Sequence, residues 1–265
     1  MTGALAGRTI LVVLAHPDDE ALACGGTVAR AADAGARVVL VCASRGELGS
    51  ISDPALVPDG DLGRVRALEL GASAAVLGAA EVLVLDHGDG FLRWPVTSAF
   101  DEELLALLAC YQPAAVITFD SDGLYWHGDH IGIHERTTRA VGAMGAQAPP
   151  LYYVTMASGV MRAVTEYAHA RGGAPPEAGL WGVSPDAFGD ASPTPSFRVD
   201  VRDWIGRKLS ALRCHRSQFG AESPFAWIDE ADARRWLGFE LFRRAETETC
   251  GEDVLERLGE PLAEA

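Results

Sequence analysis

The chain has 265 residues, and its 37 acidic and 22 basic side chains give a formal net charge of −15 at pH 7. This charge disfavours nonspecific binding to nucleic acid or to an anionic membrane surface, so a small molecule is the expected ligand. No run approaches the roughly 20 apolar residues that span a bilayer, and residues 1–8 are too short and too weakly basic for a signal peptide. We therefore expect a soluble, cytoplasmic protein.

Apolar runs rich in β-branched residues alternate with helical patterns along the first 155 residues. Continuous runs of this kind are typical of parallel strands that are buried on both faces. The alternation predicts an α/β fold, a Rossmann-like, doubly wound, mostly parallel sheet with helices on both faces. If the strand order is 3-2-1-4-5, the loops after the first and fourth strands are neighbours. The predicted strands are residues 9–15, 38–43, 82–85, 114–119 and 151–155, and the predicted helices are residues 20–34, 62–77, 100–111 and 130–144.

The remaining residues are expected to complete a single domain over residues 1–265, in which residues 1–155 form the Rossmann-like core. Residues 156–196 are rich in Gly, Pro and Ser and are interpreted as an irregular insertion on the substrate side, with one helix around 160–170. The segment 197–250 is predicted to contain a strand at 197–201 and a helix at 203–215. Residues 251–265 are predicted to be an acidic, weakly packed tail.

One imidazole and three carboxylates, from His16, Asp18, Asp19 and Glu20, directly follow the first predicted strand. Carboxylates held this close raise one another's pKa, so a cation or a bound water is expected among them. Ligands of doubly wound sheets bind beyond the carboxyl ends of the strands, where the strand order reverses. At that point the loop after the fourth strand, with residues 125–130, would lie beside residues 16–20. Two histidines and one carboxylate with an open position suit Zn²⁺ better than Mg²⁺.

The residues alone leave several roles open. His130 and His134 are one helical turn apart on the same face, so either could supply the second imidazole. Asp19 and Glu20 could instead interact with the positive N-terminus of the following helix. Asp18 stands beside a predicted ligand, which is the position of a base that takes a proton from a metal-activated water.

The motif His-Pro-Asp-Asp-Glu at 16–20, followed by His-Gly-Asp-His at 127–130, resembles the PIG-L / LmbE-like family of zinc-dependent N-acetylglucosaminyl deacetylases. Other matching segments are residues 45–49, 66–70, 89–90 and 208–218. The resemblance implies one Zn²⁺ per chain, bound by His16, Asp19 and His130, with Asp18 as the general base. The chain departs from the family pattern at Gly128, where proline is usual. Glycine allows this loop more backbone conformations.

The resemblance also implies that His127 assists the oxyanion or the leaving group, and a protonated ring would suit this role. Asp129 is interpreted as a carboxylate that orients an imidazole. The proton for the departing amine could come from Asp18 or from His127. Four residues are predicted to contact substrate: Arg66, Asp89, Tyr125 and His215. Each has a competing interpretation. Arg66 could be a surface charge paired with Glu69, and Asp89 a solvated loop acid. Tyr125 could pack in the core, and His215 could interact with the dipole at a helix C-terminus.

The sequence thus predicts a zinc-dependent hydrolase that removes the N-acetyl group from an N-acetylglucosaminyl-type small molecule and releases acetate and a free amine. An amidase that cleaves a related glycosyl or thiol conjugate is the alternative enzyme. A non-catalytic nucleotide-binding module is disfavoured, because the first strand is not followed by Gly-x-Gly-x-x-Gly. The oligomeric state is left open, and a homo-oligomer remains one of the options.

Overall fold

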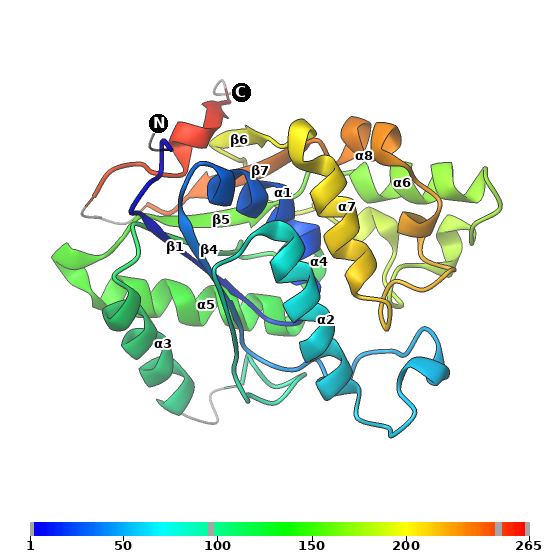
Figure 1. Cartoon of the computed structure of the whole chain (residues 1–265), viewed down its shortest axis with the longest axis horizontal. Helices are drawn as coiled ribbons and strands as arrows, with labels where there is room; N and C mark the ends of the chain where they lie inside the picture. The colour runs from blue at the N-terminus through cyan, green and yellow to red at the C-terminus, as the bar shows by residue number, and fades with distance from the viewer. Residues whose placement is uncertain (1–2, 95–97, 247–250, 263–265) are drawn as a thin grey trace.

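The computed structural model describes residues 3–94, 98–246 and 251–262. Within these residues, an eight-stranded sheet has the order β3-β2-β1-β4-β5-β7-β6-β8 (Figure 1). Neighbours among β1 to β5 are parallel, and β7, β6 and β8 extend the sheet with antiparallel pairs. The strands are β1 (Thr9–Leu14), β2 (Arg37–Cys42), β3 (Glu81–Val84), β4 (Ala115–Phe119), β5 (Leu151–Thr155), β6 (Phe197–Asp200), β7 (Phe239–Arg244) and β8 (Gly259–Pro261).

Helices cover the sheet in two groups. Helices α1, α2 and α7 pack against one another, and α3 packs against α5 on the opposite side of the sheet (Figure 1). This division arises because the connections between parallel strands are right-handed. After β3 the chain crosses back over the sheet to β4, on the other side of β1, so the later helices cover the opposite face. The helices are α1 (Asp19–Asp33), α2 (Leu62–Leu77), α3 (Ser98–Tyr111), α4 (Gly123–Trp126), α5 (Gly128–Ala143), α6 (Val160–His169), α7 (Ile205–Cys214) and α8 (Glu230–Trp236).

The mostly parallel α/β fold is confirmed, and its first five strands have the order 3-2-1-4-5 that brings the loops after β1 and β4 together. The bounds of each predicted element lie within two residues of those observed. Strand β7 was not predicted, because one of its two buried positions is occupied by the charged residue Glu240 and only the other, Phe242, is apolar. The weakly packed tail is wrong for the described residues 251–262. Val254 and Leu255 are buried there, and β8 pairs with β6. Residues 247–250 and 263–265 lie outside the described part of the chain.

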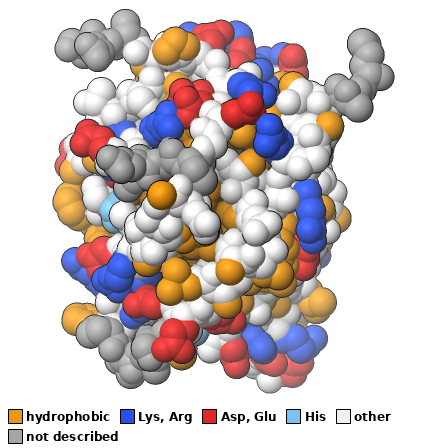
Figure 2. Space-filling model, turned by 90° about the vertical axis from the view of Figure 1, so that its left-hand side faces the viewer, with side chains coloured by type: hydrophobic (Ala, Val, Ile, Leu, Met, Phe, Trp, Pro, Cys, Tyr) orange, Lys and Arg blue, Asp and Glu red, His pale blue; other side chains and the backbone are white. Residues whose placement is uncertain are grey.

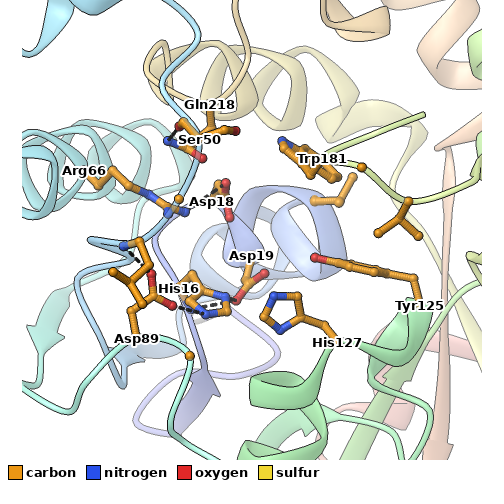
Figure 3. Close-up of a pocket in the computed structure, with 16 residues that line it drawn as sticks. His16, Asp18, Asp19, Ser50, Arg66, Asp89, Tyr125, His127, Trp181 and Gln218 are labelled. Carbon is orange, nitrogen blue, oxygen red and sulfur yellow. Dashed lines mark hydrogen bonds and ion pairs between the residues drawn. The ribbon is translucent and has the colours of Figure 1, made fainter. Parts of the chain in front are cut away.

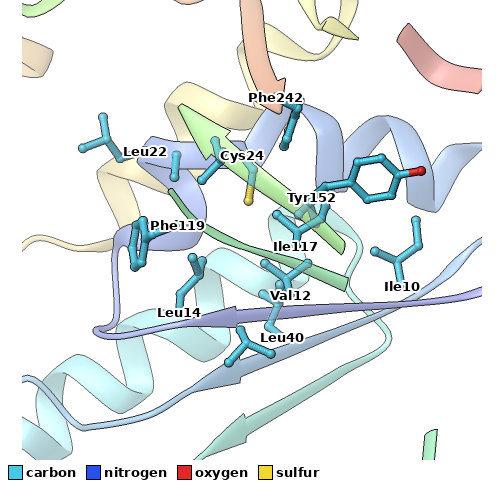
Figure 4. Close-up of a cluster of buried hydrophobic side chains, with 14 of the residues drawn as sticks. Ile10, Val12, Leu14, Leu22, Cys24, Leu40, Ile117, Phe119, Tyr152 and Phe242 are labelled. Carbon is cyan, nitrogen blue, oxygen red and sulfur yellow. The ribbon is translucent and has the colours of Figure 1, made fainter. Parts of the chain in front are cut away.

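The core lies on both faces of the parallel strands. The side chains of β1 are almost fully buried from Ile10 to Leu14, as expected for a strand in the middle of a doubly wound sheet. Figure 4 shows apolar side chains of α1 meeting those of β1, β2, β4, β5 and β7 in one cluster. Among the described residues, no helix has the length and apolar character needed to cross a membrane.

Candidate active site

A pocket of ≈ 540 Å³ opens beyond the carboxyl ends of the parallel strands. This volume lies within the range of about 300–1,000 Å³ that is typical of small-molecule sites. The loops after β1, β2 and β3 and the segment around α4 contribute to its wall, as the predicted strand order requires. Figure 3 shows the side chains that line it, among them His16, Asp18, Asp19, Ser50, Arg66, Asp89, Tyr125, His127, Trp181 and Gln218.

Three predicted metal ligands converge at the floor of this pocket. The His16 Nδ1 atom lies 3.3 Å from His130 Nε2 and 3.5 Å from Asp19 Oδ2, and His130 Nε2 lies 3.2 Å from Asp19 Oδ1. Ligand atoms placed tetrahedrally around zinc at 2.0–2.1 Å stand about 3.3 Å apart. The three side chains therefore fit a zinc ion in both donor chemistry and spacing.

The outer nitrogen of each imidazole is already engaged. His130 Nδ1 lies 3.1 Å from the Gly123 carbonyl oxygen, and its ring stacks on Phe119 at a centroid distance of 4.0 Å. His16 Nε2 lies 3.1 Å from Asp89 Oδ1 and 3.2 Å from Asp129 Oδ2. Partners of this kind fix the ring orientation of metal-binding histidines, and they leave Nε2 of His130 and Nδ1 of His16 facing each other.

Carboxylates surround His16 and favour positive charge at this point. Burial alone would lower the pKa of His16, but hydrogen bonds with Asp129, Asp19 and Asp89 raise it well above its usual value. Burial would likewise raise the pKa of Asp89, but the hydrogen bond and positive charge of His16, together with the Leu48 amide and Arg66, outweigh burial and lower the pKa to about 2. A site built in this way attracts a cation.

The two outer carboxylates tie three loops together through backbone amides. Asp129, in the first turn of α5, accepts hydrogen bonds from the amides of Gly90 at 2.7 Å and Leu92 at 3.0 Å. Asp89 accepts one from the amide of Leu48 at 2.7 Å. Asp129 is thus placed to orient the imidazole of His16. Asp89 lines the pocket, but its carboxylate is already engaged by His16 and a backbone amide.

Asp18 faces the pocket from a strained backbone position. Its φ of 114° lies in the left-handed region, which costs free energy in a residue other than glycine and is typical of functional sites. Burial raises the pKa of its carboxyl to about 6, although the neighbouring Arg66 guanidinium opposes the rise. Asp18 Oδ2 lies 3.2 Å from Arg66 Nη2. The Asp18 carboxylate therefore pairs with the Arg66 guanidinium, beside the three predicted metal ligands.

Arg66 is buried, which rules out the alternative of a surface charge paired with Glu69. Its guanidinium donates to the carbonyl oxygens of Gly46 and Pro17, each at 2.7 Å. The Glu69 carboxylate instead accepts from the amide and hydroxyl of Ser217. Arg66 therefore joins the loops after β1 and β2 and holds Asp18 in place.

His127 forms the N-cap of α5 and keeps a neutral ring. The Asp129 amide donates to His127 Nδ1 at 3.3 Å, so the neutral tautomer carries its proton on Nε2. Burial lowers the pKa of His127 to about 4, with His130 and His16 adding to the effect. The protonated ring expected from the sequence is therefore disfavoured. The cap also fixes the loop despite Gly128, where an added Cβ would meet nothing within 4 Å.

Two predicted histidines lie outside the ligand cluster. His134 Nδ1 lies 3.0 Å from the Phe119 carbonyl oxygen, and its ring packs against Tyr153. His215 is fully buried at the end of α7 and does not line the pocket. Its Nε2 atom lies 2.7 Å from Glu20, whose carboxylate also accepts from the Asp18 amide and the Ser73 hydroxyl. The structure therefore favours support of the Asp18 loop by His215 over direct contact with substrate.

Tyr125 lines the pocket together with residues that the sequence analysis missed. Its ring lies 4.5 Å from Phe188 and 6.5 Å from Trp181, measured between centroids. Trp126, the tryptophan adjacent to the motif, is 58% exposed and is not part of the pocket wall. The position of Trp181 within the predicted substrate-side insertion was the available signal. Gln218 ends the segment 208–218 that resembles the family, but only His215 of that segment was predicted to contact substrate.

Comparison with known proteins identifies the family. Residues 11–141 match the PIG-L profile, described as GlcNAc-PI de-N-acetylase. A 1D-myo-inositol 2-acetamido-2-deoxy-α-D-glucopyranoside deacetylase from Acidothermus cellulolyticus is 31% identical over 89% of this chain and 88% of its own length. The chain belongs to the PIG-L family. A second relative with the same name, from Tsukamurella paurometabola, is 35% identical over 80% of this chain and 83% of its own. This PIG-L protein is accordingly a deacetylase, a hydrolase of amide bonds.

Solved structures show how widely the fold of this PIG-L protein is used. N,N'-diacetylchitobiose deacetylase from Pyrococcus horikoshii has a TM-score of 0.64 and 22% identity over 90% of this chain and 84% of its own. The 4-carboxy-2-hydroxymuconate hydratase from Pseudomonas putida has a TM-score of 0.61 and 21% identity over 92% of this chain and 99% of its own. Because a deacetylase and a hydratase share the architecture, the fold alone does not fix the reaction.

Proposed function

We propose that this protein is a zinc-dependent deacetylase that removes the acetyl group from an N-acetylglucosaminyl-type small molecule and releases acetate and a free amine. The observation that carries the proposal is the convergence of ligand atoms from His16, Asp19 and His130 within 3.2–3.5 Å of one another. The names of the sequence relatives support an acetylated amino sugar as the substrate.

The chain's own residues account for the proton transfers. His16, Asp19 and His130 would hold one zinc ion, which polarises an acyl oxygen and makes water a stronger acid. The Asp18 carboxylate accepts a proton from the attacking water, and Arg66 keeps that carboxylate in position. As the C–N bond breaks, Asp18 returns the proton to the amine nitrogen. His127 is unsuited to that step, because its ring is neutral and its Nδ1 accepts the Asp129 amide hydrogen.

His127 is placed to stabilise the negative charge that develops on the acyl oxygen. Its Nε2–H is left as a free donor by the cap contact at Nδ1, and the residue lines the pocket. A donor of this kind is worth roughly 10²- to 10³-fold in rate in other hydrolases. The neutral ring can fill this role, because a hydrogen bond to the developing oxyanion does not need a formal charge on the donor.

Removal of the metal tests the proposal. Dialysis against a chelator is expected to abolish acetate release from N-acetylglucosamine conjugates, and one equivalent of Zn²⁺ is expected to restore it, whereas Mg²⁺ is not. Acetate and free amine should appear in equal amounts. Release of a larger acid from acylated glycosyl or thiol conjugates, without acetate from any acetylated one, would instead favour the amidase.

The aromatic side chains of Tyr125 and Trp181 in the pocket wall are proposed to hold the sugar ring, and a Trp181 variant tests this. Trp181→Ala is expected to raise KM by about three- to tenfold through loss of apolar contact, with little change in kcat. Trp126→Ala is the matched control, because Trp126 lies outside the pocket wall and should alter neither constant. A large fall in kcat with unchanged KM would contradict a binding role for Trp181.

A further inference from the structure

A second pocket, of ≈ 800 Å³, adjoins the active-site pocket. Trp181 and Gln218 line both pockets, so the two volumes meet across these side chains. The last turn of α7 and the residues that follow it form one wall of the second pocket, and Ser52 and Asp53 lie on another side. A substrate bound next to the predicted metal ligands could therefore extend past Trp181 into the second pocket.

Two arginines of this wall, Arg213 and Arg216, lack the acidic partners that most of the described arginines have. On the face drawn in Figure 2, acidic and basic side chains are intermingled. Most arginines of the described chain pair with a carboxylate, as expected for a net charge of −15. Within the described residues, the Arg216 guanidinium has no hydrogen bond or ion pair. Arg213, three residues earlier, donates only to the Ile228 carbonyl oxygen.

The backbone around Arg216 is held firmly at the border of the two pockets. Its carbonyl oxygen accepts from the Ser52 hydroxyl at 2.7 Å. Ser217 bonds to Glu69 of α2, and Gln218 Nε2 donates to the Ser50 carbonyl oxygen at 2.9 Å. The arginine is thus attached to a rigid segment that also lines the active-site pocket, and this limits the entropy lost when its side chain binds a ligand.

The helix dipole and the nearby acids do not account for both arginines. Arg213 lies in the last turn of α7 and is favoured by the helix dipole, but Arg216 lies beyond the helix end. Two acids line the pocket, Asp53 and Glu222. Asp53 already accepts from the Ala55 amide, and neither acid forms an ion pair with these arginines in the described chain. The pocket therefore contains two arginines and two acids that are not paired with one another, and the guanidinium of Arg216 keeps its donors free for a ligand.

We propose, on the basis of the proposed function, that the second pocket binds the part of the substrate attached to the acetylated sugar, and that Arg216, aided by Arg213, recognises a carboxylate or phosphate on that part. Guanidinium groups bind both anions with two parallel hydrogen bonds. The substrate class is therefore an N-acetylglucosaminyl conjugate with an anionic aglycone.

Three α-glycosides of N-acetylglucosamine test this proposal, with 4-carboxyphenyl, 4-phosphonooxyphenyl and neutral 4-carbamoylphenyl aglycones. The readout is the ratio of kcat/KM for each anionic glycoside to that for the neutral one. Arg216→Gln is expected to lower this ratio by about fivefold, and the double variant with Arg213→Gln by more. In the wild-type protein, whichever of the carboxylate and phosphate glycosides gives the larger ratio carries the preferred anion.

Two further variants separate local recognition from the general field of the protein. Glu222→Gln removes a negative charge from the pocket and is expected to raise the ratio. Arg235→Gln removes an exposed arginine that does not line the pocket, so the ratio should not change. An equal fall in the ratio for Arg235→Gln and Arg216→Gln, or a wild-type ratio near one for both anions, would overturn the proposal.

Failure of the proposed function would be recognised separately, because it is seen as absence of acetate from all three glycosides. Calorimetric titration of the zinc-loaded wild-type protein would then still decide the subsite. Tighter binding of an anionic glycoside than of the carboxamide, lost in Arg216→Gln, would support it. Equal affinity for the three would reject it.

Discussion

Asp18→Asn is expected to lower kcat for acetate release by about 10²- to 10⁴-fold while the protein keeps its zinc, because the change removes a general base and no ligand atom. Asparagine is nearly isosteric with aspartate and tolerates the positive φ of 114° better than most residues do. His130→Ala is expected to lose the metal as well as the activity. Acetate assay and metal analysis of each purified variant distinguish the two results.

A control variant separates the loss of one particular carboxylate from the general loss of a negative charge. Asp86 is a loop acid whose side chain is 86% exposed and bonds only to Arg45. Asp86→Asn should change neither metal content nor rate. Equal metal loss in Asp18→Asn and His130→Ala would show that Asp18 is a ligand, and the division of roles between Asp18 and Asp19 would be wrong.

The sequence predicted the half of the fold that is built from continuous apolar strands. Buried parallel strands such as β1 need apolar side chains on both faces, so their residues stand out in the sequence. The antiparallel half was harder to predict. In β7 one of the two buried positions holds Glu240, which is stabilised by partners distant in the sequence, and no local pattern can report those partners.

The candidate site divides in the same way. His16, Asp19 and His130 lie in two short motifs, and the predicted strand order was enough to bring these motifs together. Trp181 and Gln218 reach the pocket from irregular segments whose paths depend on packing against the completed domain. The neutral state of His127 also lay beyond the sequence, because it arises from burial and from neighbouring rings that only the folded chain supplies.

Lys208 and Glu240 form a buried ion pair against α1, the helix that begins with the predicted metal ligand Asp19. Helix α1, which begins at Asp19, is interrupted at Cys24, where φ is −142° and ψ is 21°. Glu240 accepts from the amides of Gly26 and Thr27 at 2.9 and 2.7 Å. Lys208 donates to the Leu22 carbonyl oxygen at 2.9 Å and to Glu240. The pair thus satisfies backbone groups on both sides of the interruption.

Lys208→Met is therefore expected to lower the free energy of unfolding by about 3–5 kcal/mol, because it leaves the buried Glu240 carboxylate without its counter-ion. Denaturant unfolding of the zinc-loaded protein measures the loss. Adding Glu240→Gln should recover part of it, since no unpaired charge then remains, although a glutamine oxygen accepts more weakly from the two amides. Arg234→Met, which removes an exposed cation, should stay within about 0.5 kcal/mol of the wild type.

The same variant also reports on the site, because the interruption lies five residues beyond Asp19. If the ion pair holds the first turn of α1 in place, Lys208→Met should also weaken zinc binding, measured by competition with a chromogenic chelator under conditions where the variant is folded. Lost stability with unchanged zinc affinity would confine the pair to the core. Unchanged stability would contradict the need for a counter-ion and would mean that the two amides of α1 alone are enough to hold Glu240 in place.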